Sequence, residues 1–281
     1  MDRREFFRLS ATGALMLPQL SSVLRAQAAP PGPIDCNCMF GPSNTLTSAY
    51  EKLEGLTADL DYYGVEAALA YHSYARFIDA RQGNDMISGI ARQRDRVRPC
   101  WVIYPSPAEL PHAGEFVEKM RAEGVRALRI FPGQRDPNTF GLPVQSWNFG
   151  PLLAALESHR VPLLVERELL SWEDIYTLAT SYKRLPLVLL AARFGESRNI
   201  YALLETCPNV YFSLTYYLLF NGLEDLVRRF GAERFLFDSG LPEREPSMVL
   251  PIIYFSDIQD HDRELILRGN FERLWRSAYG G

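Results

Sequence analysis

The chain has 281 residues, of which 47% are hydrophobic and 23% charged, and its formal net charge is −4. This balance is typical of a globular protein, and the length suits one large α/β barrel domain. The negative charge offers no basic face for nucleic acid, and no apolar run approaches the roughly 18 residues of a membrane-spanning helix. Four cysteines are too few for a disulfide scaffold.

Residues 1–28 predict an export signal. Arg3 and Arg4 precede a modest apolar run over residues 11–20, and Ala26-Gln27-Ala28 has the small-residue pattern of a cleavage site. The paired arginines and the mild hydrophobicity resemble a twin-arginine signal, with an ordinary secretory signal or an uncleaved anchor as the alternative. We therefore expect an exported protein, periplasmic or otherwise extracytoplasmic, whose barrel domain occupies residues 29–281.

From residue 34 onward, short apolar runs alternate with amphipathic stretches. Such continuously apolar runs are typical of parallel strands covered on their outer face. The stretches between them predict helices with recognisable ends, such as residues 112–123, which Gly124 follows, and the helix that Ser171 caps. Eight strand–helix units predict an α/β chain that forms a single (β/α)8 TIM barrel. A doubly wound sheet is the alternative. The predicted strands are 34–39, 66–72, 98–104, 126–131, 161–167, 186–192, 210–215 and 234–239.

Five segments carry a resemblance to the amidohydrolase-related family of metal-dependent hydrolase and decarboxylase barrels. The resemblance covers the whole chain after the export signal and implies a barrel whose chemistry lies at the C-terminal ends of the strands. The matching segments are IDCNCMFG (34–41), similar to the opening strand I-D-x-H-x-H-x-G; VPLLVE (161–166), similar to the fifth strand, which ends in a ligand histidine; LLAARFG (189–195), similar to the sixth strand, which ends in His-x-Gly; RFLFDSGLP (234–242), similar to the eighth strand, which ends in Gly-Ser-Asp-x-Pro; and ILRGNFERLW (266–275), similar to the closing Gly-Asn helix start.

The resemblance places unusual residues at the metal-binding positions. The amide and thioether groups found there are poor zinc ligands, and an arginine cannot coordinate a metal because it stays protonated. We therefore expect no metal or other cofactor, and a guanidinium, that of Arg193, in the space of the metal with Glu166 as its partner. The family's ligand positions fall on Asn37, Met39, Glu166, Arg193 and Gly240, with Asp238 two residues before the last of these.

Without a metal, a carboxylate has to activate water, which suits esters and lactones better than amides. Barrels that resemble 2-pyrone-4,6-dicarboxylate lactonases hydrolyse lactones without metal, although that group keeps its first-strand histidines. The sequence therefore predicts a metal-independent hydrolase of a small carboxylated or hydroxylated ester or lactone. We expect Glu166, Asp238 and Arg193 to be catalytic, with either acid as the general base. Arg129 would polarise a carbonyl or bind a carboxylate.

The remaining expectations concern the substrate and the alternatives. We expect Asn37, Met39, His72, Tyr104 and Arg129 to bind the small-molecule substrate, although His72 could equally be a structural histidine. The charged turn 76–81 after the second strand is expected to be a solvated loop. Two other functions stay open: a non-catalytic exported binding protein, and a hydrolase or decarboxylase whose unusual metal site uses Glu166, Asp238 and His72. The sequence predicts no oligomeric state.

Overall fold

The computed structural model describes residues 31–43, 48–104, 112–132 and 144–280. Residues 32–281 form one compact unit. The export signal predicted at residues 1–28 lies outside the described residues and stays a prediction. Within the described part, no helix is long and apolar enough to cross a membrane.

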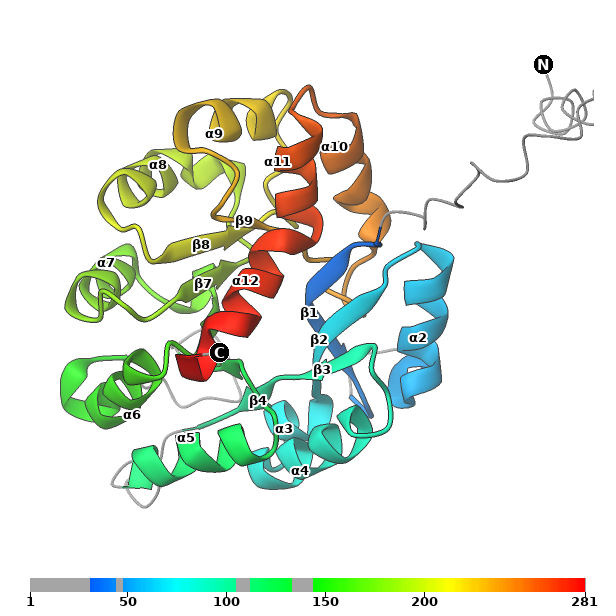
Figure 1. The fold of residues 1–281 in the computed structure, drawn as a ribbon, viewed down its shortest axis with the longest axis vertical. Helices are drawn as coiled ribbons and strands as arrows, with labels where there is room; N and C mark the ends of the chain where they lie inside the picture. Colours follow the sequence, from blue (N-terminus) through cyan, green and yellow to red (C-terminus); the bar gives the residue numbers. More distant parts are fainter. Residues whose placement is uncertain (1–30, 44–47, 105–111, 133–143, 281) are drawn as a thin grey trace, which may run out of the picture. The chain divides into compact units, whose positions relative to one another are not determined.

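Parallel strands form the centre of the fold (Figure 1). Hydrogen bonds join them in the order β1-β2-β3 and β4-β5-β6-β7-β8-β9, and every pair is parallel. Their side chains are nearly all buried, as the apolar runs in the sequence predict. The strands are β1 (Ile34–Phe40), β2 (Ala67–His72), β3 (Val97–Pro99), β4 (Trp101–Val102), β5 (Leu128–Arg129), β6 (Leu163–Glu166), β7 (Leu187–Leu190), β8 (Val210–Ser213) and β9 (Phe235–Leu236).

Backbone hydrogen bonds close the ring between its first and last strands. Cys36 N donates to Phe237 O at 3.1 Å, and Met39 N donates to Leu241 O at 2.8 Å. The chain that continues β9 therefore lies beside β1. The predicted closed (β/α)8 barrel is confirmed, and each predicted strand has its counterpart in the ring.

The predicted strand 98–104 is interrupted at Cys100, which separates β3 from β4. Cys100 N still donates to Ala70 O of β2, at 2.8 Å. Two residues further along, at Val102, the hydrogen-bond partner of the backbone is the buried side chain of Asn84. Its Nδ2 donates to Val102 O, and Val102 N donates to its Oδ1, both at 2.8 Å. A side-chain amide therefore satisfies the strand edge where β2 has ended.

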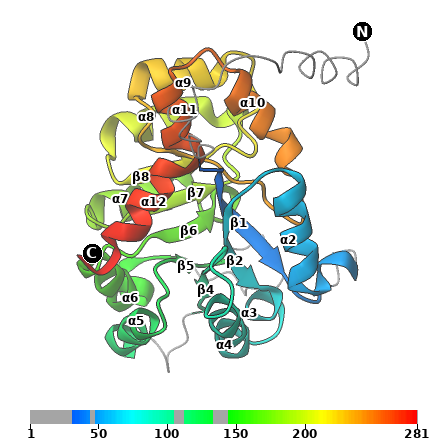
Figure 2. The same ribbon diagram turned by 45° about the vertical axis from the view of Figure 1, so that its right-hand side comes forward.

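Helices surround the strands on their outer side (Figures 1 and 2). The predicted cap at Ser171 is confirmed, because its Oγ accepts a hydrogen bond from Asp174 N at 3.0 Å. Gly124, with φ +73°, ends the helix predicted at residues 112–123, as expected. The helices are α2 (Leu53–Tyr62), α3 (Ser73–Phe77), α4 (Ala80–Ala91), α5 (Ala113–Ala122), α6 (Ser146–Ser158), α7 (Trp172–Ser181), α8 (Ser197–Thr206), α9 (Gly222–Phe230), α10 (Leu250–Phe255), α11 (Asp260–Glu264) and α12 (Asn270–Ser277).

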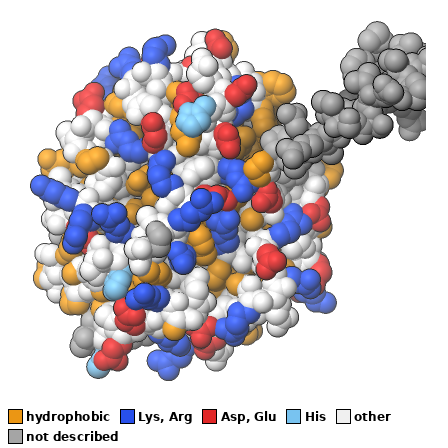
Figure 3. Space-filling model, in the orientation of Figure 1, with side chains coloured by type: hydrophobic (Ala, Val, Ile, Leu, Met, Phe, Trp, Pro, Cys, Tyr) orange, Lys and Arg blue, Asp and Glu red, His pale blue; other side chains and the backbone are white. Residues whose placement is uncertain are grey.

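Helix α12 crosses the end of the barrel at which the strands begin (Figure 1). Asn270 Nδ2 donates to Ala232 O at 2.7 Å and to Phe235 O at 2.8 Å, next to the start of β9. On this face, basic side chains gather near the middle with acidic ones beside them (Figure 3). Arg98 and Arg268, for example, both pair with Glu272 of α12. The open end of the barrel is therefore the opposite one, where the strands end.

We expect Asn84→Ala to destabilise the protein by about 2–3 kcal/mol, because it leaves a buried N–H and a buried carbonyl of Val102 without partners. Urea unfolding would measure the change. Gln82→Ala on the exposed face of α4 is the matched control and should leave stability nearly unchanged. Equal stabilities for the two variants would contradict a strand-replacing role for Asn84.

Candidate active site

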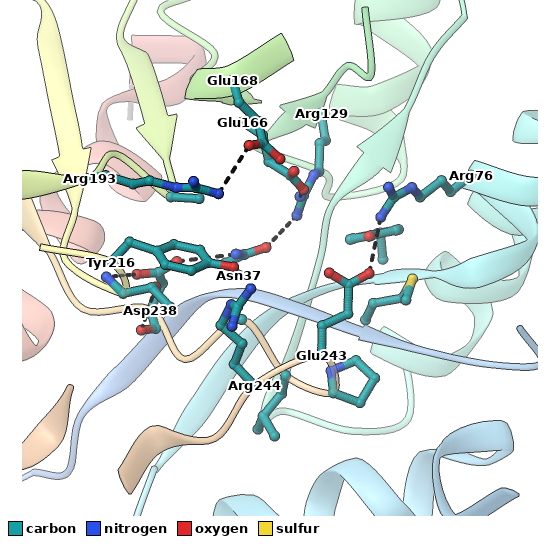
Figure 4. Close-up of a pocket in the computed structure, with 17 residues that line it drawn as sticks. Asn37, Arg76, Arg129, Glu166, Glu168, Arg193, Tyr216, Asp238, Glu243 and Arg244 are labelled. Carbon is teal, nitrogen blue, oxygen red and sulfur yellow. Dashed lines mark hydrogen bonds and ion pairs between the residues drawn. The ribbon is translucent and has the colours of Figure 1, made fainter. Parts of the chain in front are cut away.

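A pocket of about 160 Å³ lies at the C-terminal ends of the strands (Figure 4). In a (β/α)8 barrel this is the end at which active sites are built. Six of the eight residues predicted for the site line it: Asn37, Met39, Arg129, Glu166, Arg193 and Asp238. The other lining residues are Tyr71, Arg76, Glu168, Ala191, Thr215, Tyr216, Gly240, Leu241, Pro242, Glu243 and Arg244.

The guanidinium of Arg129 lies at the centre of this group. Its side chain is only 3% exposed, and its Nη2 pairs with Glu166 Oε1 at 2.6 Å. Its Nη1 donates to Asn37 Oδ1, and the group lies 4.8 Å from the ring centre of Tyr71 and 4.7 Å from that of Phe131. Burial opposes the charge, but Tyr71 and Glu166 outweigh it, so the pKa of Arg129 lies above its ordinary value. A permanent cation therefore sits in the pocket.

Asn37 connects this cation to Asp238. Its Nδ2 donates to Asp238 Oδ2 at 3.1 Å, so the two ends of one amide contact a donor and an acceptor. Thr215 N donates to Asp238 Oδ1 at 3.0 Å. Asp238 is fully buried, and burial raises its pKa despite the opposing hydrogen bonds from Thr215 and Asn37. A carboxyl group with a raised pKa at the pocket wall can take up and release a proton.

A second buried carboxyl group, that of Asp35, supports these residues from behind. Its Oδ1 accepts hydrogen bonds from Asn37 N at 3.0 Å and from Ser239 N at 3.1 Å. It thereby joins β1 to the chain that follows β9. Burial raises its pKa to about 7; hydrogen bonding by Ser239 opposes the rise and the nearby Asp238 adds to it. The two aspartates therefore share one desolvated environment.

The predicted pairing of Arg193 with Glu166 is wrong. Arg193 pairs with Glu168 instead, with 3.3 Å between Nη2 and Oε2, and its side chain is 59% exposed. The reason is its position three residues beyond the end of β7, after Ala191 has turned the chain with φ +58°. Arg129 belongs to β5 itself and points inward, so it provides the central cation. The prediction of a guanidinium beside Glu166 was correct in kind and named the wrong arginine.

His72 and Tyr104 lie outside the lining of the pocket. His72 Nδ1 accepts a hydrogen bond from Tyr74 N at 3.2 Å and so caps α3, while burial lowers the pKa of its ring. Tyr104 donates through its hydroxyl to Arg76 O at 2.8 Å and stacks on Phe131. Because His72 is directed to this cap, the predicted metal set of Glu166, Asp238 and His72 is not brought together.

The rim of the pocket contains charged residues that the sequence analysis missed. Arg76 belongs to the expected solvated turn, yet its side chain is only 15% exposed and it pairs with Glu243 at 3.4 Å. The guanidinium of Arg244 lies 3.9 Å from the ring centre of Tyr216. All of these residues lie just after the C-terminal ends of strands, and in a barrel this position is the sequence signal that could have identified them.

A larger hollow of about 490 Å³ lies outside the barrel, between α4 and α5. Its charged groups include Asp85 and Lys119, which pair with each other at 3.7 Å. Of these two hollows, the smaller pocket is the better candidate site, because there the strand ends bring buried ionisable groups together.

The comparisons with known proteins agree with this architecture. A family model described as amidohydrolase matches residues 48–277. The chain belongs to the amidohydrolase family. No curated protein sequence matches closely enough to count as a relative. The match to the family model confirms the predicted family.

Solved structures of low sequence identity share the fold. They include a 2,6-dihydroxybenzoate decarboxylase from Rhizobium (14% identity, TM-score 0.68, covering 87% of this chain and 98% of that one). A putative 2-pyrone-4,6-dicarboxylic acid hydrolase from Pseudomonas putida has 14% identity and a TM-score of 0.64, covering 89% and 99%. A dihydroxybenzoic acid decarboxylase from Polaromonas, with bound manganese, has 15% identity and a TM-score of 0.63, covering 87% and 97%. At these identities the likeness concerns the fold.

The residues at the family's metal positions do not fit a metal ion in this chain. Among the described residues, no three His, Cys, Asp or Glu side chains are grouped so that they could hold one. Two of the positions, Asn37 and Glu166, are instead occupied in binding the Arg129 guanidinium. A divalent cation at that place would face a fixed positive charge in a low-dielectric surrounding.

Arg129→Met should destabilise the protein by roughly 3–5 kcal/mol, because it leaves Glu166 partly buried without its partner. Arg193→Met should cost less than about 1 kcal/mol, because its pair with Glu168 is exposed. Chemical unfolding of both variants measures the difference. Similar losses in the two variants would contradict the central position of Arg129.

The raised pKa of Asp35 predicts a loss of stability with rising pH. Between its ordinary pKa of 3.8 and about 7, the folded protein keeps a proton that the unfolded chain releases. The free energy of unfolding should therefore fall by at most about 1.4 kcal/mol per pH unit in this window. Asp35→Asn should weaken that dependence, whereas Asp260→Asn on the surface should not. Urea unfolding at about pH 5 and about pH 8 tests this prediction. An equal change in the free energy of unfolding between the two pH values in Asp35→Asn and wild type would contradict it.

Proposed function

We propose that this member of the amidohydrolase family is a metal-independent hydrolase of a small ester or lactone. The observation that supports it most is the buried Arg129 guanidinium between Asn37 and Glu166. Nucleophilic attack on an ester carbonyl places negative charge on its oxygen, and a fixed cation in a desolvated pocket stabilises that charge. Arg129 thus supplies the electrostatic part of what a metal would do.

Asp238 is the proposed general base. Glu166 is held as the charge partner of Arg129, whereas the hydrogen bonds to Asp238 come from neutral groups, among them Thr215 N and Asn37 Nδ2. In its ionised form it takes a proton from water as the oxygen of that water bonds to the carbonyl carbon. The bond from carbon to the leaving oxygen then breaks, and that oxygen receives the proton. Raised basicity makes Asp238 the stronger candidate.

The size of the site supports a small substrate. Its volume of about 160 Å³ is below the roughly 300–1,000 Å³ typical of pockets for drug-sized ligands. The twin-arginine-like pattern in residues 1–28 supports action outside the cytoplasm. The similar structures include a 2,6-dihydroxybenzoate decarboxylase and a putative 2-pyrone-4,6-dicarboxylic acid hydrolase, which supports small carboxylated compounds as the first to test.

Hydrolysis should survive metal removal and depend on Asp238. With a panel of small esters and lactones, including 2-pyrone-4,6-dicarboxylate, wild-type turnover should be unchanged after treatment with a chelator. Asp238→Asn should lower kcat by a factor of about 10²–10⁴, whereas Asp260→Asn should have the kcat of wild type.

Two results would contradict the proposal. Activity that the chelator removes and manganese restores would place a metal in the reaction. No turnover of any panel member, despite measurable binding, would favour the non-catalytic binding protein.

A further inference from the structure

Two arginines approach the same aromatic ring at the rim of the pocket. The guanidinium carbon of Arg244 lies 3.9 Å from the ring centre of Tyr216, and that of Arg193 lies 5.5 Å from it. Figure 4 shows the Tyr216 ring between the two groups. They come from different loops, after β7, β8 and β9, so the closed barrel brings them together. The two cations are no farther apart than these two distances combined.

Each glutamate that lines the pocket is paired with an arginine other than Arg244. Glu166 is bound by Arg129, and Glu243 by Arg76. Arg193 has Glu168, but both side chains are about half exposed, at 59% and 46%, so this ion pair is weak and can open. Among the described residues, Arg244 forms no ion pair with an acidic side chain.

The surroundings of Arg244 favour an anion beside it. Its side chain is partly buried over Tyr216, and burial lowers its pKa, as does the neighbouring Arg193; Glu166 and Glu168 act in the opposite direction but do not offset the shift. Two like charges held close together at a pocket wall raise the local concentration of anions. An anion at the edge of the Tyr216 ring, in contact with both guanidinium groups, would offset the repulsion and accept hydrogen bonds from both.

We propose that Arg193, Arg244 and Tyr216 form a subsite that binds a carboxylate of the substrate. Planar guanidinium forks match the two oxygens of a carboxylate, and the aromatic ring fixes the direction of both forks. Arg193 occupies the place where the family pattern has its sixth-strand histidine. That the ligand is a substrate rests on the proposed function. The binding itself can be tested without any turnover.

The test measures binding of benzene-1,3-dicarboxylate and of its uncharged analogue, benzene-1,3-dicarboxamide, by calorimetry. Wild type should bind the dicarboxylate at least about tenfold more tightly than the diamide, and Arg244→Ala and Arg193→Ala should each remove about tenfold of that preference. Tyr216→Phe keeps the ring and should bind like wild type. Arg228→Ala changes an arginine on α9 whose side chain is 71% exposed, so it is the matched control and should have no effect.

The outcomes separate this inference from the proposed hydrolysis. Equal affinities for the dicarboxylate and the diamide, or unchanged binding in a folded Arg244→Ala variant, overturn the subsite. Thermal unfolding establishes that the variant is folded, and Arg244→Lys, which keeps the charge, should bind between alanine and wild type. Arginine-dependent binding without turnover of any ester keeps the subsite and overturns the hydrolase. Turnover of neutral and carboxylated esters with equal KM, unchanged in Arg244→Ala, overturns the subsite alone.

Discussion

The contact between Arg129 and Glu166 is the constraint on which the rest of the site depends. A guanidinium that is 3% exposed is acceptable only with a charge partner, hydrogen-bond acceptors and polarisable rings around it. Glu166, Asn37, Tyr71 and Phe131 meet these needs from four different parts of the chain. These contacts join strands of the barrel to one another at the end where the pocket lies.

The seam between β1 and the chain after β9 transmits this constraint to Asp238. Asp35 binds the backbone N–H of Asn37 on β1 and that of Ser239 in the chain after β9. Asn37 then presents its oxygen to the cation and its amide nitrogen to Asp238. Desolvation raises the pKa of both aspartates, so the protonation state of the site depends on how tightly the seam is packed.

The fold and part of the lining could be predicted from the sequence, because strand periodicity and the spacing of motifs are local signals. Six of the 17 residues that line the pocket were predicted for this reason. The partner of Glu166 could not be predicted in this way. Arg129 lies within an apolar run and Arg193 lies just after one, and the turn at Ala191 decides that Arg193 leaves the barrel interior. The roles of Arg244 and Tyr216 likewise depend on three loops that meet only in the folded ring.

The chain of contacts from Glu166 through Arg129 and Asn37 to Asp238 also restricts the evolutionary paths open to this chain. Replacing Asn37 or Glu166 alone by histidine would remove one of the two oxygen acceptors of the guanidinium, and removing Arg129 alone would leave Glu166 without its charge partner. Each single step passes through a destabilised intermediate. Substitutions at positions 37, 129 and 166 are therefore expected to be tolerated together and not one at a time.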